Sequence, residues 1–289
     1  MCDNPLKKRK TMETAEATLR ELEDPTNMGL LQNKNPHELD KRIRFKEEGH
    51  IYWIDGVSEN TMSSTTLIKK FFPSFDKDRA TRYIFASKRH QNDETYKYYK
   101  MSKDEIIKSW ADKGTKSAAI GTYNHLQLEL YYNGLDYDRT IPEINMFMDF
   151  VDSLDPNWEP YRTEMLIFHP ILRVTGSVDM IYRDKSDGKL IMVDWKFCKA
   201  IGKSKSNGVG IGKLSHLNND KYYHYALQLN LYKRILEEIY GFEVKKMLIV
   251  CLHRSQSKFK KIEVIKLDNE ISYILNERKK ELVYKNIGD

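Results

Sequence analysis

Two aspartates and a lysine in the second half of the chain have a spacing that could support metal-assisted hydrolysis. Asp179 lies in the apolar segment SVDMIY and Asp194 in LIMVDWKF, and the turn-forming sequence KSDGK lies between the two segments. Antiparallel pairing of two such strands would bring both carboxylates together. Adjacent buried carboxylates repel each other unless a cation neutralises them, and hard oxygen ligands favour Mg²⁺ or Mn²⁺.

Lys196 follows Asp194 by two residues, so on a strand both side chains project from the same face. An ammonium group there can orient an attacking water or balance the charge of a phosphate, which points to hydrolysis of a phosphodiester. An isolated Asp-x-Lys in a strand is usually an exposed ion pair of small energetic value. Here apolar residues flank both acids, and burial of these charges without a function is a poor explanation.

The segments GSVDMIY and MVDWKF resemble motifs II and III of the PD-(D/E)XK nuclease superfamily. Asp179 matches the first acid, and Asp194, Trp195 and Lys196 match the D/E-x-K element. GTYNHLQLE is similar to a helix of the RecB-like and mitochondrial genome-maintenance exonuclease branches, in which a histidine adds a metal ligand; here that residue is His125. The resemblance implies that His125, Asp179, Asp194 and the main-chain carbonyl of Trp195 hold Mg²⁺ or Mn²⁺, and that Lys196 assists the water.

Further residues match the same branches. QLNLY is similar to their helical Q-x-x-x-Y element, which implies that Gln228 and Tyr232 contact the substrate or position the lysine. Glu164 resembles an acid found on the preceding strand, and the sequence leaves open whether it faces the site or solvent. Glu129, four residues after His125, shares a helix face with it, and its role is equally open.

The sequence also departs from the family pattern. Asp194 stands where many members have Glu, and Trp195 stands where Tyr or Val is common; neither change breaks the chemistry. Some RecB-like members hold an iron-sulfur cluster through four cysteines. This chain has three cysteines at unrelated spacings, so we expect no iron-sulfur cluster.

The elements that must position these residues follow from periodicity and turn signals. Residues 1–40 read as a flexible charged tail, with one short helix around residues 13–23. Residues 41–112 predict a small N-terminal α+β lobe made of a hairpin and helices, with Gly114 and Gly121 interrupting the helices around them. Residues 113–289 hold the nuclease motifs. The expected fold class is α/β, with a restriction-endonuclease-like core in which a mixed central β-sheet is flanked by helices.

The glycine- and lysine-rich segment between Ile201 and Asp220 predicts a mobile basic loop directly after the suspected site. Its GVGIGKL sequence departs from a phosphate-binding loop, because Asn207 replaces a required glycine and Leu214 a required serine or threonine. Four lysines could line a groove for phosphates, the alternative being a solvated loop: Lys203, Lys205, Lys213 and Lys221.

Composition sets the wider limits. The chain has 289 residues, 40% of them hydrophobic, a net charge of +6 and a pI near 8.9, which is compatible with a polyanionic partner. Cysteine usage fits an intracellular protein, and no apolar run is long enough to span a membrane. The N-terminal PLKKRK resembles a nuclear-import signal, although a solvated basic tail is the commoner reading.

The motif matches, from Gly121 to Tyr232, predict a Mg²⁺- or Mn²⁺-dependent DNA exonuclease that prefers single-stranded ends and acts in DNA replication, recombination or repair. A ribonuclease or an endonuclease of the same fold remains an alternative. A further alternative, from another class, is an inactive nucleic-acid-binding module. Intact Asp179, Asp194 and Lys196 argue against that last alternative.

Overall fold

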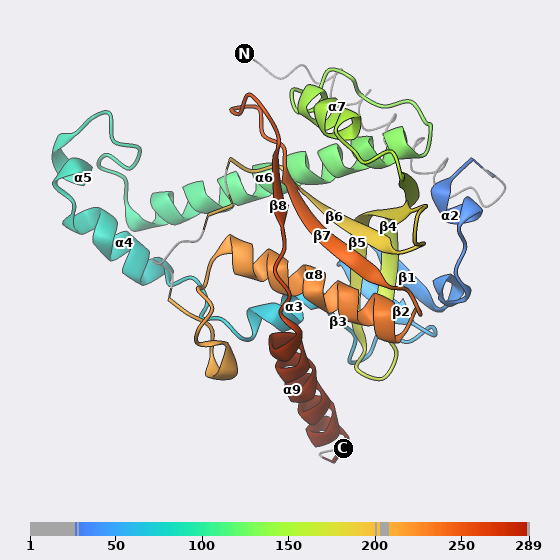
Figure 1. Cartoon of the computed structure of the whole chain (residues 1–289). Coiled ribbons are helices and arrows are strands. Elements are labelled where there is room, and N and C mark those ends of the chain that lie inside the picture. Colours follow the sequence, from blue (N-terminus) through green and yellow to red (C-terminus); the bar gives the residue numbers. More distant parts are fainter. Residues whose placement is uncertain (1–26, 28, 200, 203–207, 288–289) are drawn as a thin grey trace.

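A computed structural model describes residues 27, 29–199, 201–202 and 208–287. Its centre is a mixed β-sheet with helices on both faces (Figure 1). Across the described residues the sheet has six strands in the order β3-β5-β6-β7-β8, with β4 on the other edge of β5. The strands are β3 (Met62–Ser63), β4 (Trp158–His169), β5 (Val174–Asp184), β6 (Leu190–Lys196), β7 (Val244–Cys251) and β8 (Lys260–Glu263). The expected mixed sheet flanked by helices is therefore present.

The strands β4, β5 and β6 form the antiparallel unit that the sequence predicts. β6 then pairs in parallel with β7, and β7 pairs antiparallel with β8. A parallel connection needs a crossover, and helix α8 (Lys221–Glu238) supplies it between β6 and β7. The sheet is mixed because two of its pairings, β3 with β5 and β6 with β7, are parallel, while the others are antiparallel.

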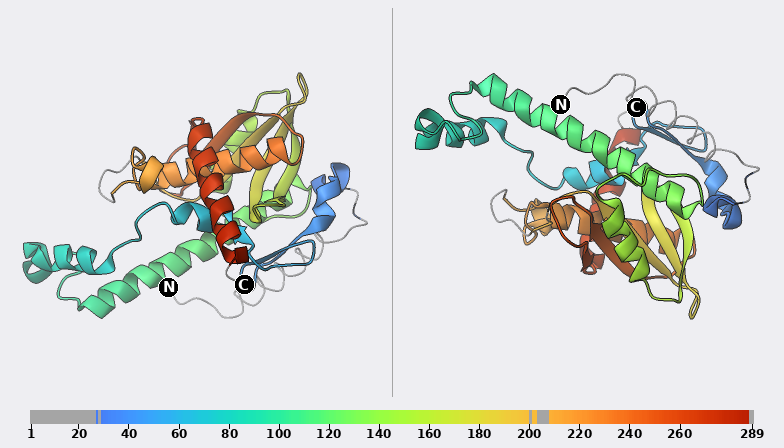
Figure 2. Two further views of the ribbon diagram at one scale, coloured as in Figure 1. Left: turned by 90° about the horizontal axis from the view of Figure 1, so that it is seen from below. Right: turned by 90° about the horizontal axis from the view of Figure 1, so that it is seen from above.

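Two apolar cores lie on opposite faces of the sheet. Helices α8, α3 (Ser64–Lys69) and α9 (Asp268–Ile287) cover one face, while α6 (Lys103–Tyr132) and α7 (Ile144–Asp152) cover the other (Figures 1 and 2). Alternating side chains of β6 divide between them: Met192 packs into the α8 core, whereas Val193 and Trp195 pack into the α7 core. The same alternation places Asp194 on the α8 side of the sheet.

Helices α4 (Lys77–Ala86), α5 (Lys88–Asn92) and the first turns of α6 project away from the sheet (Figures 1 and 2). Helix α6 starts at a capping box between Ser102 and Glu105 and runs unbroken through Gly114 and Gly121. The expected interruption at these glycines is wrong, because a helical glycine costs only about 1 kcal/mol and the surrounding turns outweigh it. The predicted lobe boundary between residues 112 and 113 lies within this helix.

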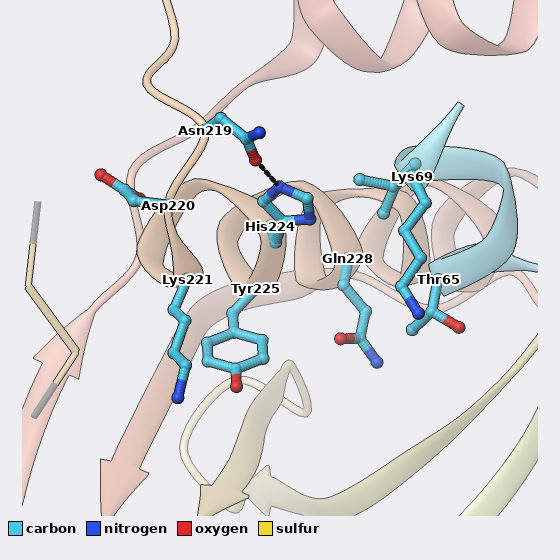
Figure 3. A pocket seen from close by; sticks show the side chains of 9 residues that line it. Thr65, Lys69, Asn219, Asp220, Lys221, His224, Tyr225 and Gln228 are labelled. Carbon is cyan, nitrogen blue, oxygen red and sulfur yellow. Dashed lines mark hydrogen bonds between the residues drawn. The ribbon is translucent and has the colours of Figure 1, made fainter. Parts of the chain in front are cut away.

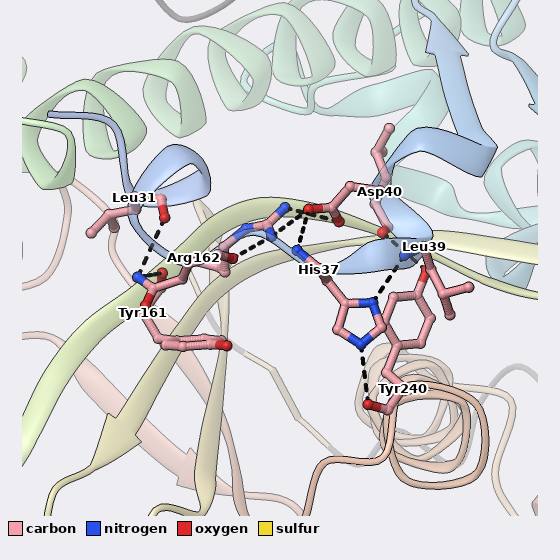
Figure 4. A network of polar contacts seen from close by, with 9 residues as sticks. Leu31, His37, Leu39, Asp40, Tyr161, Arg162 and Tyr240 are labelled. Atoms are coloured by element: carbon pink, nitrogen blue, oxygen red, sulfur yellow. Dashed lines mark hydrogen bonds and ion pairs between the residues drawn. The ribbon is translucent and has the colours of Figure 1, made fainter. Parts of the chain in front are cut away.

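The chain is already packed on the sheet well before residue 40. Leu30 and Leu31 are buried, and a buried guanidinium on β4, that of Arg162, donates 2.9 Å from Nη1 to Oδ2 of Asp40 (Figure 4). The N-terminal elements are α2 (Leu31–Lys34), η1 (Glu38–Arg42), β1 (Ile43–Lys46) and β2 (Ile51–Ile54). Residues 30–40 are therefore not part of a flexible tail as expected. They are held by a few separate contacts, such as buried Leu30 and the Asp40–Arg162 bond, and these contacts produce no periodic pattern in the sequence. The predicted helix at 13–23 and the PLKKRK segment lie outside the described residues.

Residues 208–220 of the basic loop have defined local structure. They contain the short helix η2 (Gly212–Leu214) and a bridge between Val209 and Asn218. Leu214 and Leu217 are buried in the α8 core, which explains this local structure. Lys203 and Lys205 lie outside the described residues. In the part of the chain that the structure describes, no helix is both long and apolar enough to cross a membrane.

Candidate active site where two strands diverge

The charged cluster lies where β5 and β6 separate. Their ladder ends at the pair Met180–Val193, and β3 pairs with the other end of β5 only up to Thr175. Within the described residues, positions 176–179 of β5 therefore have no strand partner on this edge. The gap leaves room for side chains at the middle of the sheet, and Asp179 occupies one end of it.

Asp179 and Asp194 lie on the two diverging strands, each one residue beyond the last pair of their ladder. The main-chain N–H of Trp195 donates a 2.8 Å hydrogen bond to Oδ2 of Asp179. Nζ of Lys196 lies 2.6 Å from Oδ2 of Asp194, which is buried. The two-residue period of a strand thus brings Lys196 and Asp194 to one place.

Glu164 lies beside the cluster on strand β4 and has an unusual backbone conformation. The β4–β5 ladder pairs Thr163 with Met180 and Met165 with Val178, so Glu164 lies opposite Asp179. Its φ of +41° lies in the left-handed region, which costs a non-glycine residue about 1–3 kcal/mol and is concentrated at functional sites. Oε2 of Glu164 accepts a 2.8 Å hydrogen bond from Oγ of Ser177. Glu164 therefore faces the site rather than solvent.

His125 reaches the two carboxylates from helix α6. Its Nδ1 lies 3.5 Å from Oε1 of Glu164 and 3.5 Å from Oδ2 of Asp179. One potential ligand atom from each of the three residues lies within 4.8 Å of the others. Carboxylates suit Mg²⁺ and Mn²⁺, and an imidazole adds a nitrogen ligand. His125, Glu164 and Asp179 thus have the chemistry and the spacing to hold a divalent cation.

Burial and neighbouring charges shift the pKa values of the titratable groups in this cluster. Burial raises the pKa of Asp179, and neighbouring His125 and Lys196 offset only part of that effect. Burial likewise raises the pKa of Asp194 to about 6, with Lys196 opposing the shift. Burial alone would lower the pKa of His125, but the charges of Asp179 and Glu164 outweigh it and raise that pKa to about 9. Burial thus disfavours the charged form of both aspartates, and nearby positive charge favours it.

Lys196 stays charged in this environment. Burial alone would lower its pKa, but the carboxylates of Asp194 and Asp179 outweigh burial and raise it. Its Nζ also lies 4.7 Å from the centre of the Tyr225 ring on α8, in a cation–π arrangement. A lysine that remains protonated at neutral pH can hold and orient anionic or polar groups, whereas it cannot accept a proton from water.

Glu129 lies one helical turn beyond His125. Burial, followed by the negative charge of Glu164, raises the pKa of Glu129 to about 8. Burial therefore favours the neutral form of the Glu129 carboxyl. It does not belong to the three-residue cluster, and in its neutral form it adds no further negative charge there.

Gln228 and Tyr232 of α8 are joined by a hydrogen bond, and the ring of Tyr232 packs in the strand gap. Nε2 of Gln228 donates a 2.8 Å hydrogen bond to the Tyr232 hydroxyl, which also lies 3.1 Å from Oγ of Ser64. The Tyr232 ring packs against Gly176 in the strand gap, where any Cβ atom would overlap it. Only glycine at position 176 allows the tyrosine ring to lie so close to the backbone.

The structure thus brings most of the predicted residues to one region. The predicted metal ligands His125 and Asp179 lie together, while Asp194 contacts Lys196 and Trp195 donates its N–H to Asp179. Gln228 and Tyr232 lie on the α8 side. Sequence reasoning missed three residues, namely Gly176, Ser177 and Tyr225. Tyr225 precedes Gln228 by one helical turn, which is a signal that could have identified it.

No family model matches the chain, and no curated protein matches it. Several solved structures are similar to it, and two of them serve as examples. The crystal structure of SSO0001 is 18% identical, over 78% of this chain and 77% of that one, with a TM-score of 0.36. The crystal structure of a putative exonuclease from Eubacterium rectale is 13% identical, over 58% of this chain and 65% of that one, with a TM-score of 0.36. Likeness at this level carries no weight for the activity, which has to be inferred from the site itself.

Proposed function

We propose that the protein is a metal-dependent nuclease of the PD-(D/E)XK type that hydrolyses phosphodiester bonds in DNA. The observation that carries this proposal is the convergence of His125, Glu164 and Asp179, with Lys196 beside Asp194, at the gap between β5 and β6. Buried titratable groups with perturbed pKa values that gather in one place are typical of functional sites. The motif order along the chain supports the same conclusion.

The proposed roles follow from geometry and charge. His125, Glu164 and Asp179 hold Mg²⁺ or Mn²⁺, with Asp194 and the Trp195 carbonyl available as further ligands. A metal bound there lowers the pKa of a water molecule and stabilises charge that develops on a phosphate. Lys196 remains an ammonium ion. It positions the attacking water or a phosphate oxygen by hydrogen bonding.

The remaining parts of the proposal concern the substrate. The similarity of the histidine-bearing helix to exonuclease branches supports end-dependent cutting of single-stranded DNA, in replication, recombination or repair. Gln228 and Tyr232 contact the substrate or position Lys196. Lys203 and Lys205 remain proposed phosphate contacts. The net charge of +6 is consistent with a polyanionic substrate.

Digestion of matched substrates tests the proposal. Linear single-stranded DNA, the same DNA closed into a circle, and RNA of the same sequence are incubated with Mg²⁺, Mn²⁺ or chelator. We expect metal-dependent loss of the linear DNA and survival of the circle. Efficient cutting of the circle would indicate an endonuclease, and preference for RNA a ribonuclease. Binding of DNA without cutting under any condition would contradict the nuclease proposal and favour an inactive binding module.

A further inference from the structure

A pocket of about 440 Å³ opens beside the candidate site, between α3 and the first turns of α8 (Figure 3). Pockets of this size commonly accommodate small organic ligands. Among the residues that line it are Thr65, Lys69, Lys221, His224, Tyr225 and Gln228. The pocket is therefore formed by two elements that lie more than a hundred residues apart in the sequence.

The pocket carries two lysines from opposite walls. Lys69 of α3 and Lys221 of α8 are both exposed and flank Tyr225 and Gln228 in Figure 3. Neither forms an ion pair with another residue that the structure describes. The carboxylate of Asp220 is the opposing charge, but it is buried and accepts a hydrogen bond from the main-chain N–H of Tyr223, capping α8. Positive charge therefore dominates the open part of the pocket.

His224 adds a polar wall without adding charge. Its Nε2 lies 2.9 Å from Oδ1 of Asn219, and its ring packs against Phe72 with a centroid distance of 4.3 Å. Burial lowers the pKa of His224 and outweighs the opposing charge of Asp220, and the charge of Lys69 adds to the lowering. Burial therefore favours the neutral imidazole, and the contacts with Asn219 and Phe72 fix its orientation. Its flat ring and the exposed Thr65 hydroxyl suit a ligand with both a planar and a polar part.

The pocket is connected directly to the candidate active site. Tyr225 lines the pocket and also contacts the Nζ of Lys196 through its ring, at 4.7 Å. Gln228 lines the pocket and donates to Tyr232, whose ring packs in the strand gap near Asp179. A ligand in the pocket would thus lie one side-chain layer away from the charged cluster.

We propose that this pocket binds a nucleotide of the substrate strand next to the bond that is cut, with Lys69 and Lys221 contacting its phosphate. This inference rests on the proposed nuclease function. Two lysines on opposite walls fit a phosphodiester better than a neutral ligand, and the neighbouring Tyr225 ring offers a surface for an unpaired base. The pocket would therefore guide a single strand toward Lys196.

The test compares Lys69→Ala, Lys221→Ala and the double variant with Lys70→Ala. Lys70 is the matched control, because it directly follows Lys69 at the C-cap of α3 but forms a 2.8 Å ion pair with Glu281. Binding of a fluorescein-labelled oligothymidylate is measured by anisotropy in chelator over a range of salt concentrations. KM and kcat are measured separately with Mn²⁺. Circular dichroism confirms that each variant is folded.

We expect the double variant to bind roughly tenfold more weakly than the wild type, with a raised KM and a nearly unchanged kcat. The slope of log affinity against log salt should fall by about 0.7 for each phosphate that the variant no longer neutralises, and Lys70→Ala should leave it unchanged. Unaltered affinity and KM in the double variant, or equal weakening by Lys70→Ala, would overturn the pocket proposal. Lysine-dependent binding by a wild-type protein that cuts no DNA would uphold the pocket and overturn the nuclease function instead.

Discussion

The main-chain N–H of Trp195 donates its hydrogen bond to the side chain of Asp179, at 2.8 Å, where the β5–β6 ladder has already ended. A side-chain acceptor thereby replaces the ladder partner that β6 has lost. The bond fixes Asp179 relative to the strand that carries Asp194 and Lys196. One hydrogen bond thus joins the two motifs just beyond Val193, the residue of β6 at which the ladder ends.

Metal should stabilise the wild-type fold and fail to stabilise Asp179→Asn. The asparagine oxygen can still accept the Trp195 N–H, while the loss of one of several adjacent carboxylates weakens cation binding. Saturation at a hundredfold excess over Kd contributes about 2.7 kcal/mol, which corresponds to a Tm rise of about 5 °C. Differential scanning calorimetry with Mn²⁺ and with chelator measures both proteins. An equal rise in the two would show that Asp179 holds no metal.

Gly176→Ala should damage both stability and activity. A methyl group at position 176 would overlap the Tyr232 ring, so the tyrosine must shift away from Gln228 and Ser64. Overpacking of this kind costs about 1–3 kcal/mol, measured by urea unfolding. Gly114→Ala is the matched control, because the space around Gly114 on α6 is open and alanine favours a helix. Destabilisation of the two variants to the same extent would refute the overlap.

Acidification should remove a stabilising contact at the far end of β5. Lys245 and Ser186 hydrogen-bond to Asp184 and hold the pKa of its carboxyl below the usual range. Because the folded pKa is lowered, this stabilisation is present above the unfolded pKa of about 3.9 and is lost as pH falls below it. Asp184→Asn should therefore lower stability near neutral pH and reduce the difference in stability between neutral and acidic pH.

Urea unfolding across this pH range, with Asp112→Asn as control, checks the prediction. Asp112 is exposed on α6 and forms no ion pair with any described residue. Its substitution should leave the pH profile close to that of the wild type. A profile of Asp184→Asn that runs parallel to the wild type would contradict the proposed contribution of Asp184.

The ion pair between Asp40 of the N-terminal segment and Arg162 of β4 should contribute to the stability of the fold. Removal of this carboxylate leaves the Arg162 guanidinium, which is only 6% exposed, without its ion-pair partner. Loss of a hydrogen bond to a buried charged group costs about 2 kcal/mol, so Asp40→Ala should lower the free energy of unfolding by that order. Asp55→Ala, which removes the exposed partner of Arg42, should have a much smaller effect. Equal effects of the two variants would argue against anchoring by Arg162.

Local periodicity was sufficient to place the central part of the candidate site. The period of two puts Asp194 and Lys196 on one face, and the KSDGK turn forces β5 and β6 to pair antiparallel. A helix over GTYNHLQLE carries His125. These features depend on residues close together in the sequence, which is why a pattern could predict them.

Other features arise from contacts between distant segments. Glu164 faces Asp179 because the register of the β4–β5 ladder places them opposite each other, and neither this register nor the positive φ of Glu164 is signalled by a pattern in the strand sequence. Gly176 is needed because a ring from α8 packs against it. Lys69 belongs to the pocket only because α3 lies beside α8. Buried anchors such as Leu30 likewise become visible only once the sheet is assembled.

Digestion of single-stranded DNA labelled at either end, by wild type and Lys196→Ala, tests the central claim most directly. Lys189→Ala is the control, because Lys189 is a half-exposed lysine beside the opposite end of β6. We predict cutting by wild type and Lys189→Ala with Mg²⁺ or Mn²⁺, none with chelator, and loss of cutting with retained DNA binding in Lys196→Ala. Near-wild-type cutting by folded Lys196→Ala, or undiminished cutting in chelator, would contradict the account.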